Sequence, residues 1–182
     1  MKESDPIANY ATKLQEAGRI TPIVEEAIEK ARLLKKTYST IFYIAGGLTG
    51  MSEEVKSRYG LLSDLVAANK GMFGYAPHLH GTDPVAHPHV TPEEVRDIDF
   101  LFAAIVPDYH LNCWYPLAHG NAVEAGWAEI NGVPSIYLVP RNIVLSRLVR
   151  GMHNIAGIIT YDVFEEDGLK KVQTFIDTKI SA

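Results

Sequence analysis

The sequence contains one cysteine among its 182 residues, Cys113, so an intrachain disulfide and a cysteine-based zinc site are excluded. Positive charge is also scarce, because 17 Lys and Arg stand against 22 Asp and Glu and leave a formal net charge of −5. Nucleic acid polymers and anionic membranes both need a positive field, so neither is an expected partner. No apolar run has the length of a membrane span or follows the N-terminus as a signal peptide would. We therefore expect a soluble, cytoplasmic protein.

The remaining composition is that of an ordinary globular chain. Hydrophobic residues make up 47% and charged residues 21%, which is enough to bury a core. Helical apolar spacing, with Thr21 as N-cap and Pro22 at the first helical position, predicts two helices before the first strand. We expect an N-terminal helical extension over residues 1–38 and an α/β domain over residues 39–182.

Strands and helices are predicted to alternate along the α/β domain. The expected strands are 40–45, 72–76, 104–107, 133–139 and 155–161, and the expected helices are 5–18, 22–36, 52–69, 91–103, 120–131, 143–150 and 165–178. This order predicts a doubly wound, Rossmann- or flavodoxin-like parallel sheet of five strands with flanking helices. Ligands of such sheets bind outside the carboxyl ends of the strands, here in the segments 46–50, 77–90, 108–119 and 140–142.

Glu124 is the first candidate for chemistry at this edge. It lies in the segment HGNAVEAGWA (119–128), early in a helix whose terminal amides favour an ionised carboxylate. An ionised carboxylate is a suitable nucleophile for an acetal-type carbon, because the transition state is cationic. Asp97 and Asp99 on the preceding helix offer a second carboxylate for an acid role. The alternative is that Glu124 only complements the helix dipole and the aspartates are solvated.

Two other segments suggest ligands without identifying them. The turn GGLTG (46–50) is neither GxGxxG nor GK[ST], so it predicts close backbone approach to a sugar or base and not a dinucleotide site. The pairs His78 and His80, and His87 and His89, place imidazoles on alternate residues, as in some metal sites. The same proline-rich loop can serve as a lid without a metal, and we expect none.

Three segments together resemble the nucleoside 2-deoxyribosyltransferase-like superfamily: FYIAGG (42–47), RDID (96–99) and the G-x-x-x-E-x-G-x-A block of residues 120–128. The resemblance covers residues 40 to 162 approximately. It implies that Glu124 attacks the anomeric carbon of a nucleoside, that Tyr43 hydrogen-bonds and orients it, and that Asp97 assists the departing base. Asp99 is the fallback for that last role. The residues expected to bind the substrate are Gly46, Gly47, Thr49, Asp99, His119, Gly120, Asn121 and Ser146.

Within that superfamily, LSRLVRG (145–151) resembles a segment of the 2′-deoxynucleoside 5′-monophosphate N-hydrolases, whose serine reaches a phosphate in the neighbouring subunit. Ser146 matches that serine. Other expected phosphate contacts differ, since Gly47 replaces a serine and Thr49 an arginine. Ala118 stands where the hydrolases have a serine and the transferases an aspartate that contacts the base. Asn112, His119 or Asn121 could supply the base contact instead.

The implied function is nucleoside 2-deoxyribosyltransferase-type cleavage of an N-glycosidic bond by double displacement, without a metal or organic cofactor. The alternatives are a nucleoside 5′-monophosphate N-glycosidase, which is a hydrolase, and a non-catalytic nucleotide-binding sensor. A pocket rich in carboxylates favours an uncharged nucleoside. One small domain has no second domain to close its cleft, so a homodimer or higher homo-oligomer with shared active sites is expected.

Overall fold

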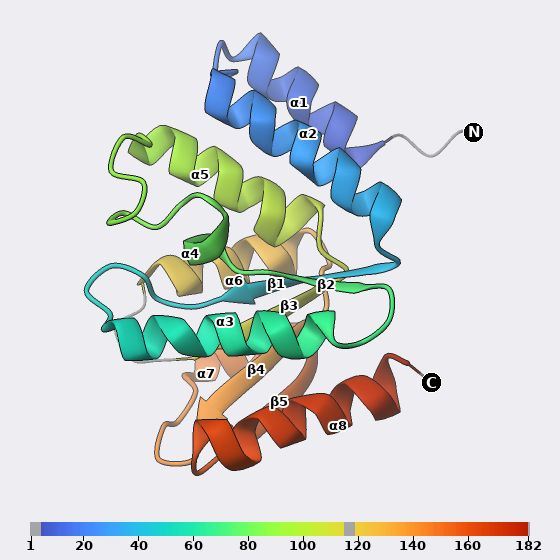
Figure 1. Ribbon diagram of the computed structural model, residues 1–182, viewed down its shortest axis with the longest axis vertical. Helices are drawn as coiled ribbons and strands as arrows, with labels where there is room; N and C mark the ends of the chain where they lie inside the picture. Colours follow the sequence, from blue (N-terminus) through green and yellow to red (C-terminus); the bar gives the residue numbers. More distant parts are fainter. Residues whose placement is uncertain (1–4, 115–118, 182) are drawn as a thin grey trace.

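The computed structural model describes residues 5–114 and 119–181, and these form one parallel sheet with the strand order β2-β1-β3-β4-β5 (Figure 1). Every strand pairing is parallel. The strands are β1 (Thr40–Ala45), β2 (Met72–Tyr75), β3 (Tyr109–Cys113), β4 (Ser135–Pro140) and β5 (Ile155–Tyr161). The doubly wound α/β fold predicted from the sequence is confirmed.

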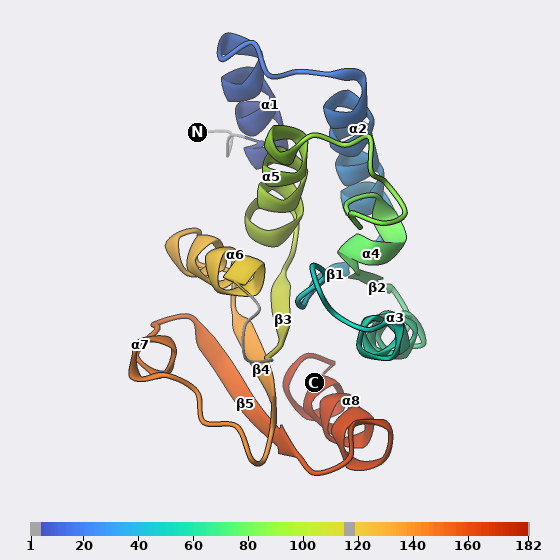
Figure 2. The ribbon, with the colours of Figure 1, turned by 90° about the vertical axis from the view of Figure 1, so that its left-hand side faces the viewer.

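Helices cover both faces of the sheet. One face carries α1 (Pro6–Glu16), α2 (Pro22–Thr37), α5 (Pro92–Phe100) and α6 (His119–Ile130), and the other carries α3 (Glu53–Ala67) and α8 (Leu169–Lys179) (Figures 1 and 2). Short helices α4 (Pro77–His80) and α7 (Arg147–Arg150) and the π-helical turns η1 (Leu101–Ile105) and η2 (Phe164–Gly168) complete the order. No helix within the described ranges is long and apolar enough to cross a membrane.

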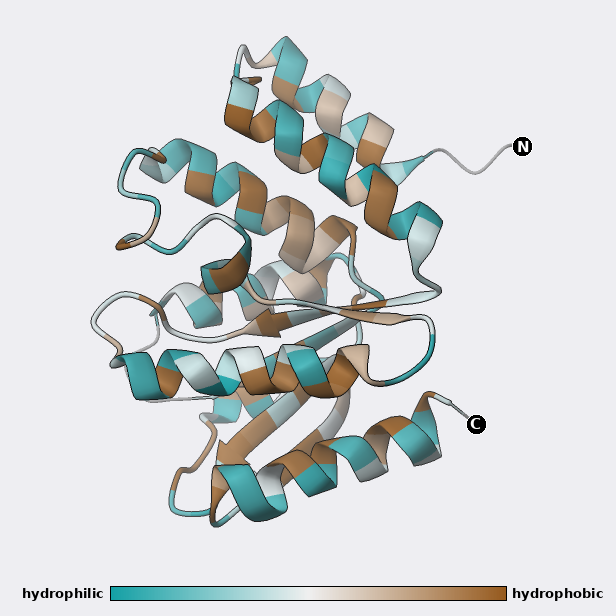
Figure 3. Ribbon diagram, viewed as in Figure 1, coloured by the Kyte–Doolittle hydropathy of each residue, from teal (hydrophilic) through white to brown (hydrophobic). Residues whose placement is uncertain are grey.

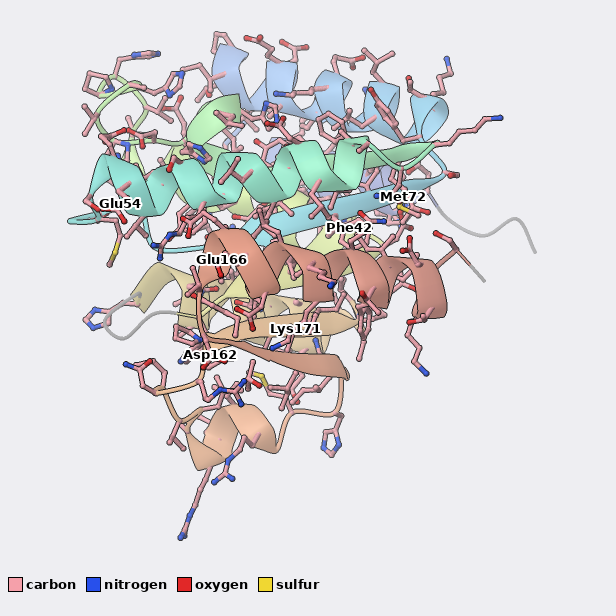
Figure 4. All side chains as sticks on the ribbon, turned by 60° about the horizontal axis from the view of Figure 1, so that its bottom comes forward. Phe42, Glu54, Met72, Asp162, Glu166 and Lys171 are labelled. Atoms are coloured by element: carbon pink, nitrogen blue, oxygen red, sulfur yellow. The ribbon has the colours of Figure 1, made fainter. Side chains whose placement is uncertain are left out.

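Alternation along β1 divides the core between the two faces. Ile41 and Tyr43 belong to a buried cluster with α1, α2 and α5, whereas Phe42 and Ile44 belong to a cluster with α3 and α8. Phe42 and Met72, labelled in Figure 4, are both members of the second cluster. Successive strand side chains point to opposite faces, so a fully buried strand supplies both layers.

The first two helices form an N-terminal hairpin (residues 6–37) that packs on α5. Thr21 caps α2 and Pro22 begins it, as predicted. The apolar positions of both helices join the same cluster as β1 and α5, and hydrophilic positions alternate with them along the outer surface (Figure 3). The hairpin therefore shares its core with the sheet. The predicted boundary at residue 38 falls between the end of α2 and the start of β1.

The third strand differs from the prediction. Residues 104–107 were expected to be a strand, but α5 continues there as the buried turn η1, and the strand is Tyr109–Cys113. Its apolar residues alternate with His110 and Asn112, which are buried and bonded to one another, at 2.6 Å between Asn112 Nδ2 and His110 Nδ1. The strand was missed in the sequence because two of its five residues are polar although the strand is buried. Asp108 therefore precedes the strand and lies at the amino edge of the sheet, although it was expected at the carboxyl edge. Its Oδ2 accepts a hydrogen bond from Ile41 N at 2.8 Å.

Candidate active site

A cavity of about 390 Å³ opens at the carboxyl edge of the sheet. The loop after β1 forms one wall, residues 82–95 form another, and α5 and α6 each contribute one carboxylate, Asp99 and Glu124. The lining residues are Gly46, Gly47, Leu48, Thr49, Thr82, Pro84, His87, Pro88, Val90, Pro92, Val95, Asp99, Gly120 and Glu124. This is the edge at which parallel α/β sheets bind ligands.

Glu124 is held in this cavity by a tyrosine from the sheet. The Tyr43 hydroxyl donates a hydrogen bond to Glu124 Oε1 at 3.0 Å, and both side chains are buried. Glu124 Oε2 has no hydrogen-bond partner among the described residues. Burial raises the pKa of Tyr43 well above its usual range, so this phenol remains a donor at neutral pH. One carboxylate oxygen is thereby fixed, and the other is free to meet a ligand.

Asp99 is the second buried carboxylate of the cavity. Burial raises the pKa of Glu124, Tyr43 and Tyr75, and the charge of Asp99 raises each of them further. Burial also raises the pKa of Asp99, and the Thr82 hydroxyl opposes that rise. Asp99 Oδ1 and the Tyr75 hydroxyl are both without a hydrogen-bond partner within residues 5–114 and 119–181. Buried polar atoms normally have partners. Asp99 lines this cavity, so the cavity is suited to a polar ligand, whereas Tyr75 lines a separate cavity beside α2.

The two carboxylates titrate together. Burial and the charge of Asp99 raise the pKa of Glu124 to about 8, and burial raises that of Asp99 to about 7. Glu124 is the sixth residue of α6, beyond the first helical turn, and burial and the charge of Asp99 both oppose the ionised carboxylate that was expected there. At neutral pH the pair holds at least one proton, which favours Glu124 because its pKa is the higher of the two, and Asp99 is partly ionised.

Asp97 does not lie in this cavity, which corrects its assignment as the acid that assists a departing base. Its side chain is 2% exposed and forms an ion pair with Arg19 of the N-terminal hairpin, at 2.9 Å from Oδ2. Two residues along a helix are about 200° apart around its axis, so Asp97 and Asp99 face opposite sides of α5. The structure brings the fallback residue, Asp99, to the site.

The loop after β1 approaches the cavity through glycines. A methyl group on Gly46 would overlap the Tyr59 ring, whose hydroxyl donates to the Gly47 carbonyl at 3.0 Å. Glycine is thus required at residue 46 by close packing. Gly46, Gly47, Thr49 and Gly120, four of the residues predicted to bind the substrate, all line the cavity.

The other expected substrate-binding residues lie outside the lining of this cavity. Asn121 is buried, and its Nδ2 donates to the Cys113 carbonyl at 3.1 Å, which ties α6 to β3. His119 is exposed at the start of α6, and Asn112 is buried against His110. Ser146 is the N-cap of α7 and accepts from Val149 N at 3.2 Å. The expectation for Ala118 lies outside the described residues.

Comparison with known proteins reveals similarity at the level of structure. The fold matches that of the CMP N-glycosidase BcmB of Clostridium botulinum with a TM-score of 0.57 and 21% identity, over 74% of this chain and 98% of that one. A conserved protein of Enterococcus faecalis V583 matches with a TM-score of 0.52 and 16% identity, also over 74% of this chain and 98% of that one. No family model and no curated protein matches the sequence. The resemblance found in the sequence is confirmed at the level of the fold.

Residues 82–90 form a structured wall of the cavity that sequence reasoning only described as a loop. Lys56 of α3 forms a buried ion pair with Asp83, 2.8 Å from its Oδ2, and Asp83 Oδ1 accepts from Val85 N and Ala86 N. His87 lines the cavity, whereas burial keeps His80 neutral with a pKa of about 4. Within the described ranges no group of three or more His, Cys, Asp or Glu is arranged to hold a metal ion.

Thr82 and Tyr75 are the residues near Asp99 that sequence reasoning missed. Tyr75 lies opposite Tyr43 in the β1–β2 register, and the two rings stack with centroids 6.0 Å apart. The placement of Tyr75 at the carboxyl end of the predicted strand 72–76 was a usable signal. Thr82 had no such signal, because it lies in the loop after α4, next to Asp83.

Proposed function

We propose that this protein cleaves the N-glycosidic bond of a nucleoside or nucleoside 5′-monophosphate, with Glu124 as nucleophile and Asp99 as acid and base. The observation that carries the proposal is the placement of both carboxylates in one cavity, with Tyr43 bonded to one oxygen of Glu124 and the other oxygen free. A carboxylate pair in which one member is ionised and the other protonated is the equipment of retaining glycoside cleavage.

The first step is displacement of the base. The reactive form of the pair has its proton on Asp99, so the proton that Glu124 holds at rest first passes to ionised Asp99. Glu124 Oε2 then forms a bond to the anomeric carbon while the bond from that carbon to the base nitrogen breaks. The bonding pair goes to the base, which takes the proton held by Asp99. Tyr43 keeps its hydrogen bond to Oε1 and limits rotation of the carboxylate. The products are a free base and a glycosyl ester of Glu124.

The second step resolves the ester. In hydrolysis a water attacks the anomeric carbon, Asp99 accepts its proton, and Glu124 leaves as a carboxylate. In transfer a second base takes the place of water. The walls at residues 82–95 and at the loop after β1 limit solvent access to the intermediate. The fold shared with a CMP N-glycosidase supports hydrolysis, and transfer to a second base is the second candidate.

The charge of the cavity bears on the 5′ group. No Lys or Arg is among the described residues that line it. One copy of the chain therefore offers no cation for a 5′-phosphate, whereas an uncharged nucleoside needs none. A 5′-phosphate needs contacts from elsewhere. Ser146 is exposed and flanked by Val144 and Leu148, each 81% exposed, which supports a homo-oligomer that brings Ser146 to a neighbouring site.

The experiment is an incubation of the purified protein with nucleosides and their 5′-monophosphates, with and without a second free base, followed by chromatography. Release of base supports the proposal, and base exchange identifies transfer. Glu124→Gln is expected to lose turnover by orders of magnitude. Glu129→Gln is the matched control, because Glu129 is on the same helix, does not line the described cavity and accepts a hydrogen bond from His153 N. If neither substrate class reacts and Glu124→Gln still binds nucleotide, the protein is a sensor.

A further inference from the structure

The N-terminal hairpin meets α5 at an ionic cluster in which buried Asp97 pairs with two partly exposed arginines. Arg19, in the turn between α1 and α2, pairs with Asp97 Oδ2 at 2.9 Å, and its Nη2 also lies 3.5 Å from the Glu93 carbonyl oxygen. Arg96 pairs with Asp97 Oδ1 at 2.6 Å, and the Tyr10 hydroxyl donates to the Asp97 carbonyl at 3.2 Å. Arg19 and Tyr10 therefore hold the first and the last turn of α5 from outside.

The same helix presents Asp99 to the cavity. Asp97 and Asp99 are about 200° apart around α5, so the side chain held by the hairpin and the side chain in the site lie on opposite faces. A helix moves as a rigid body over a few turns, so a rotation or shift of α5 at Asp97 displaces Asp99 as well. A buried carboxylate that loses one of its cations provides a reason for such a shift.

An aromatic chain extends this contact to the helix of Glu124. Tyr10 of α1 packs on Phe100 of α5 with ring centroids 5.2 Å apart, and Phe100 packs edge-on against Trp127 of α6 at 5.3 Å. Trp127 lies three residues after Glu124 on α6. Figure 2 shows α5 beside α1 and α2, with α6 below it. The hairpin thus contacts, directly or through one ring, both helices that carry the two carboxylates.

We infer that the N-terminal hairpin is a clamp that sets the position of Asp99 relative to Glu124, with Arg19 and Asp97 as positioning residues. The kinetic tests of this inference rest on the proposed function, whereas the titration test does not. It assigns Asp97 a role through α5 and not at the reacting atoms. It also assigns a purpose to helices that precede the sheet and are not needed to complete it.

The test is a double-mutant cycle of Arg19→Ala, Asp97→Asn and the double variant. Arg19→Ala is expected to lower kcat by roughly 10- to 100-fold, because a small misplacement of a catalytic group has effects of that size. The kcat of the double variant should be no lower than that of the poorer single variant, because each single substitution already removes the ion pair between Arg19 and Asp97. Arg32→Ala is the matched control, because Arg32 is on the same hairpin and pairs with exposed Glu29.

Substrates with bases of different basicity separate positioning from catalysis. Loss of a positioning residue lowers the rate for all bases by a similar factor. Loss of the acid itself penalises poor leaving groups most. If Asp97→Asn shows the second behaviour while Arg19→Ala retains activity, Asp97 is the acid and the clamp is refuted.

A second measurement does not depend on catalysis. Carbon-detected NMR titration of Asp99 and Glu124 in the ligand-free protein reports the interaction between them. The clamp predicts altered titration curves in Arg19→Ala and unchanged ones in Arg32→Ala. Unchanged curves in Arg19→Ala overturn it, whatever the activity. If Arg19→Ala does not fold, the titration is repeated with Arg19→Lys and Tyr10→Phe. Altered curves again support the clamp, and unchanged curves again overturn it. An inactive wild-type protein with altered curves in Arg19→Ala refutes the proposed function and leaves the clamp standing.

Discussion

The hydroxyl of Tyr43, on β1, and the carboxylate of Glu124, on α6 and 81 residues later in the chain, lie 3.0 Å apart inside the protein. The contact leaves one oxygen of Glu124 unpartnered within the described ranges and open to the cavity. The hydrogen bond joins β1, whose carboxyl end borders the cavity, to α6, whose amino-terminal half borders it. A strand and a helix thereby fix the orientation of one reactive oxygen.

Replacing Tyr43 by Phe removes this hydrogen bond and keeps the ring. A hydrogen bond to a charged group contributes about 1.5–3 kcal/mol, so kcat/KM for base release is expected to fall roughly 10- to 150-fold. Steady-state assays with the substrate found for the wild-type protein measure it. Tyr137→Phe is the control, because Tyr137 is equally buried and its hydroxyl lies 3.1 Å from Met152 Sδ, away from both carboxylates of the cavity. Equal losses in both variants would refute a special role for Tyr43.

Stability is expected to fall as the pH rises toward 8. Glu124 has a pKa raised from 4.5 to about 8 in the folded protein, so the folded state keeps a proton that the unfolded chain releases. Its contribution to stability is complete below the unfolded value and is lost as the pH rises through the folded value. Urea unfolding across this range should show a decrease on the order of a few kcal/mol.

Glu124→Gln should reduce that pH dependence, because the amide does not titrate, and the slope that remains is expected from Asp99, whose pKa is also raised. Glu129→Gln on the same helix should retain the wild-type slope. Parallel curves for the wild-type protein and Glu124→Gln would show that Glu124 does not carry the raised pKa. The measurement needs no substrate, so it tests the electrostatics of the site separately from its reaction.

Much of the fold followed from local patterns. The strand at residues 40–45 is a continuous β-branched and aromatic run, and Thr21-Pro22 is an N-cap followed by proline, so both were predictable. The strand Tyr109–Cys113 was not, because His110 and Asn112 are polar residues that satisfy one another within the core. The apolar run before it was assigned to a strand although it continues α5.

The sequence identified the site residues that belong to a recognisable motif. It could not decide between residues on one helix whose role depends on which side of the helix faces the cavity. Glu124 and Tyr43 were both identified, and the structure joins them. Asp97 and Asp99 are equally plausible in sequence, and only the packing of the N-terminal hairpin on one side of α5 separates them. The raised pKa of Glu124 depends on burial by distant segments, which no local pattern contains.

The ion pair between Lys56 and Asp83 should hold the loop over the cavity. Lys56→Met is expected to reduce the free energy of unfolding by about 1–3 kcal/mol, because it leaves Asp83 without its cation. It should also raise KM, since Asp83 orders Val85 and Ala86 beside the cavity. Arg141→Ala is the control, because its pair with Asp162 is exposed, and it should change stability little. An unchanged KM would separate this loop from substrate binding.

Gly46 should tolerate no side chain because of Tyr59. In Gly46→Ala the added methyl group overlaps a fully buried ring whose hydroxyl is bonded to Gly47, so the loop after β1 must move. Overpacking of this kind costs about 1–3 kcal/mol, measured by thermal or urea unfolding, and displaces a wall of the cavity, so KM should rise. Gly126→Ala is the control, since nothing lies within 4 Å of the added methyl and alanine favours the helix by up to about 1 kcal/mol. In a Tyr59→Ala background the cost of Gly46→Ala should shrink, because the two residues then no longer collide. An undiminished cost there would mean that the loop conformation, and not the ring, requires glycine.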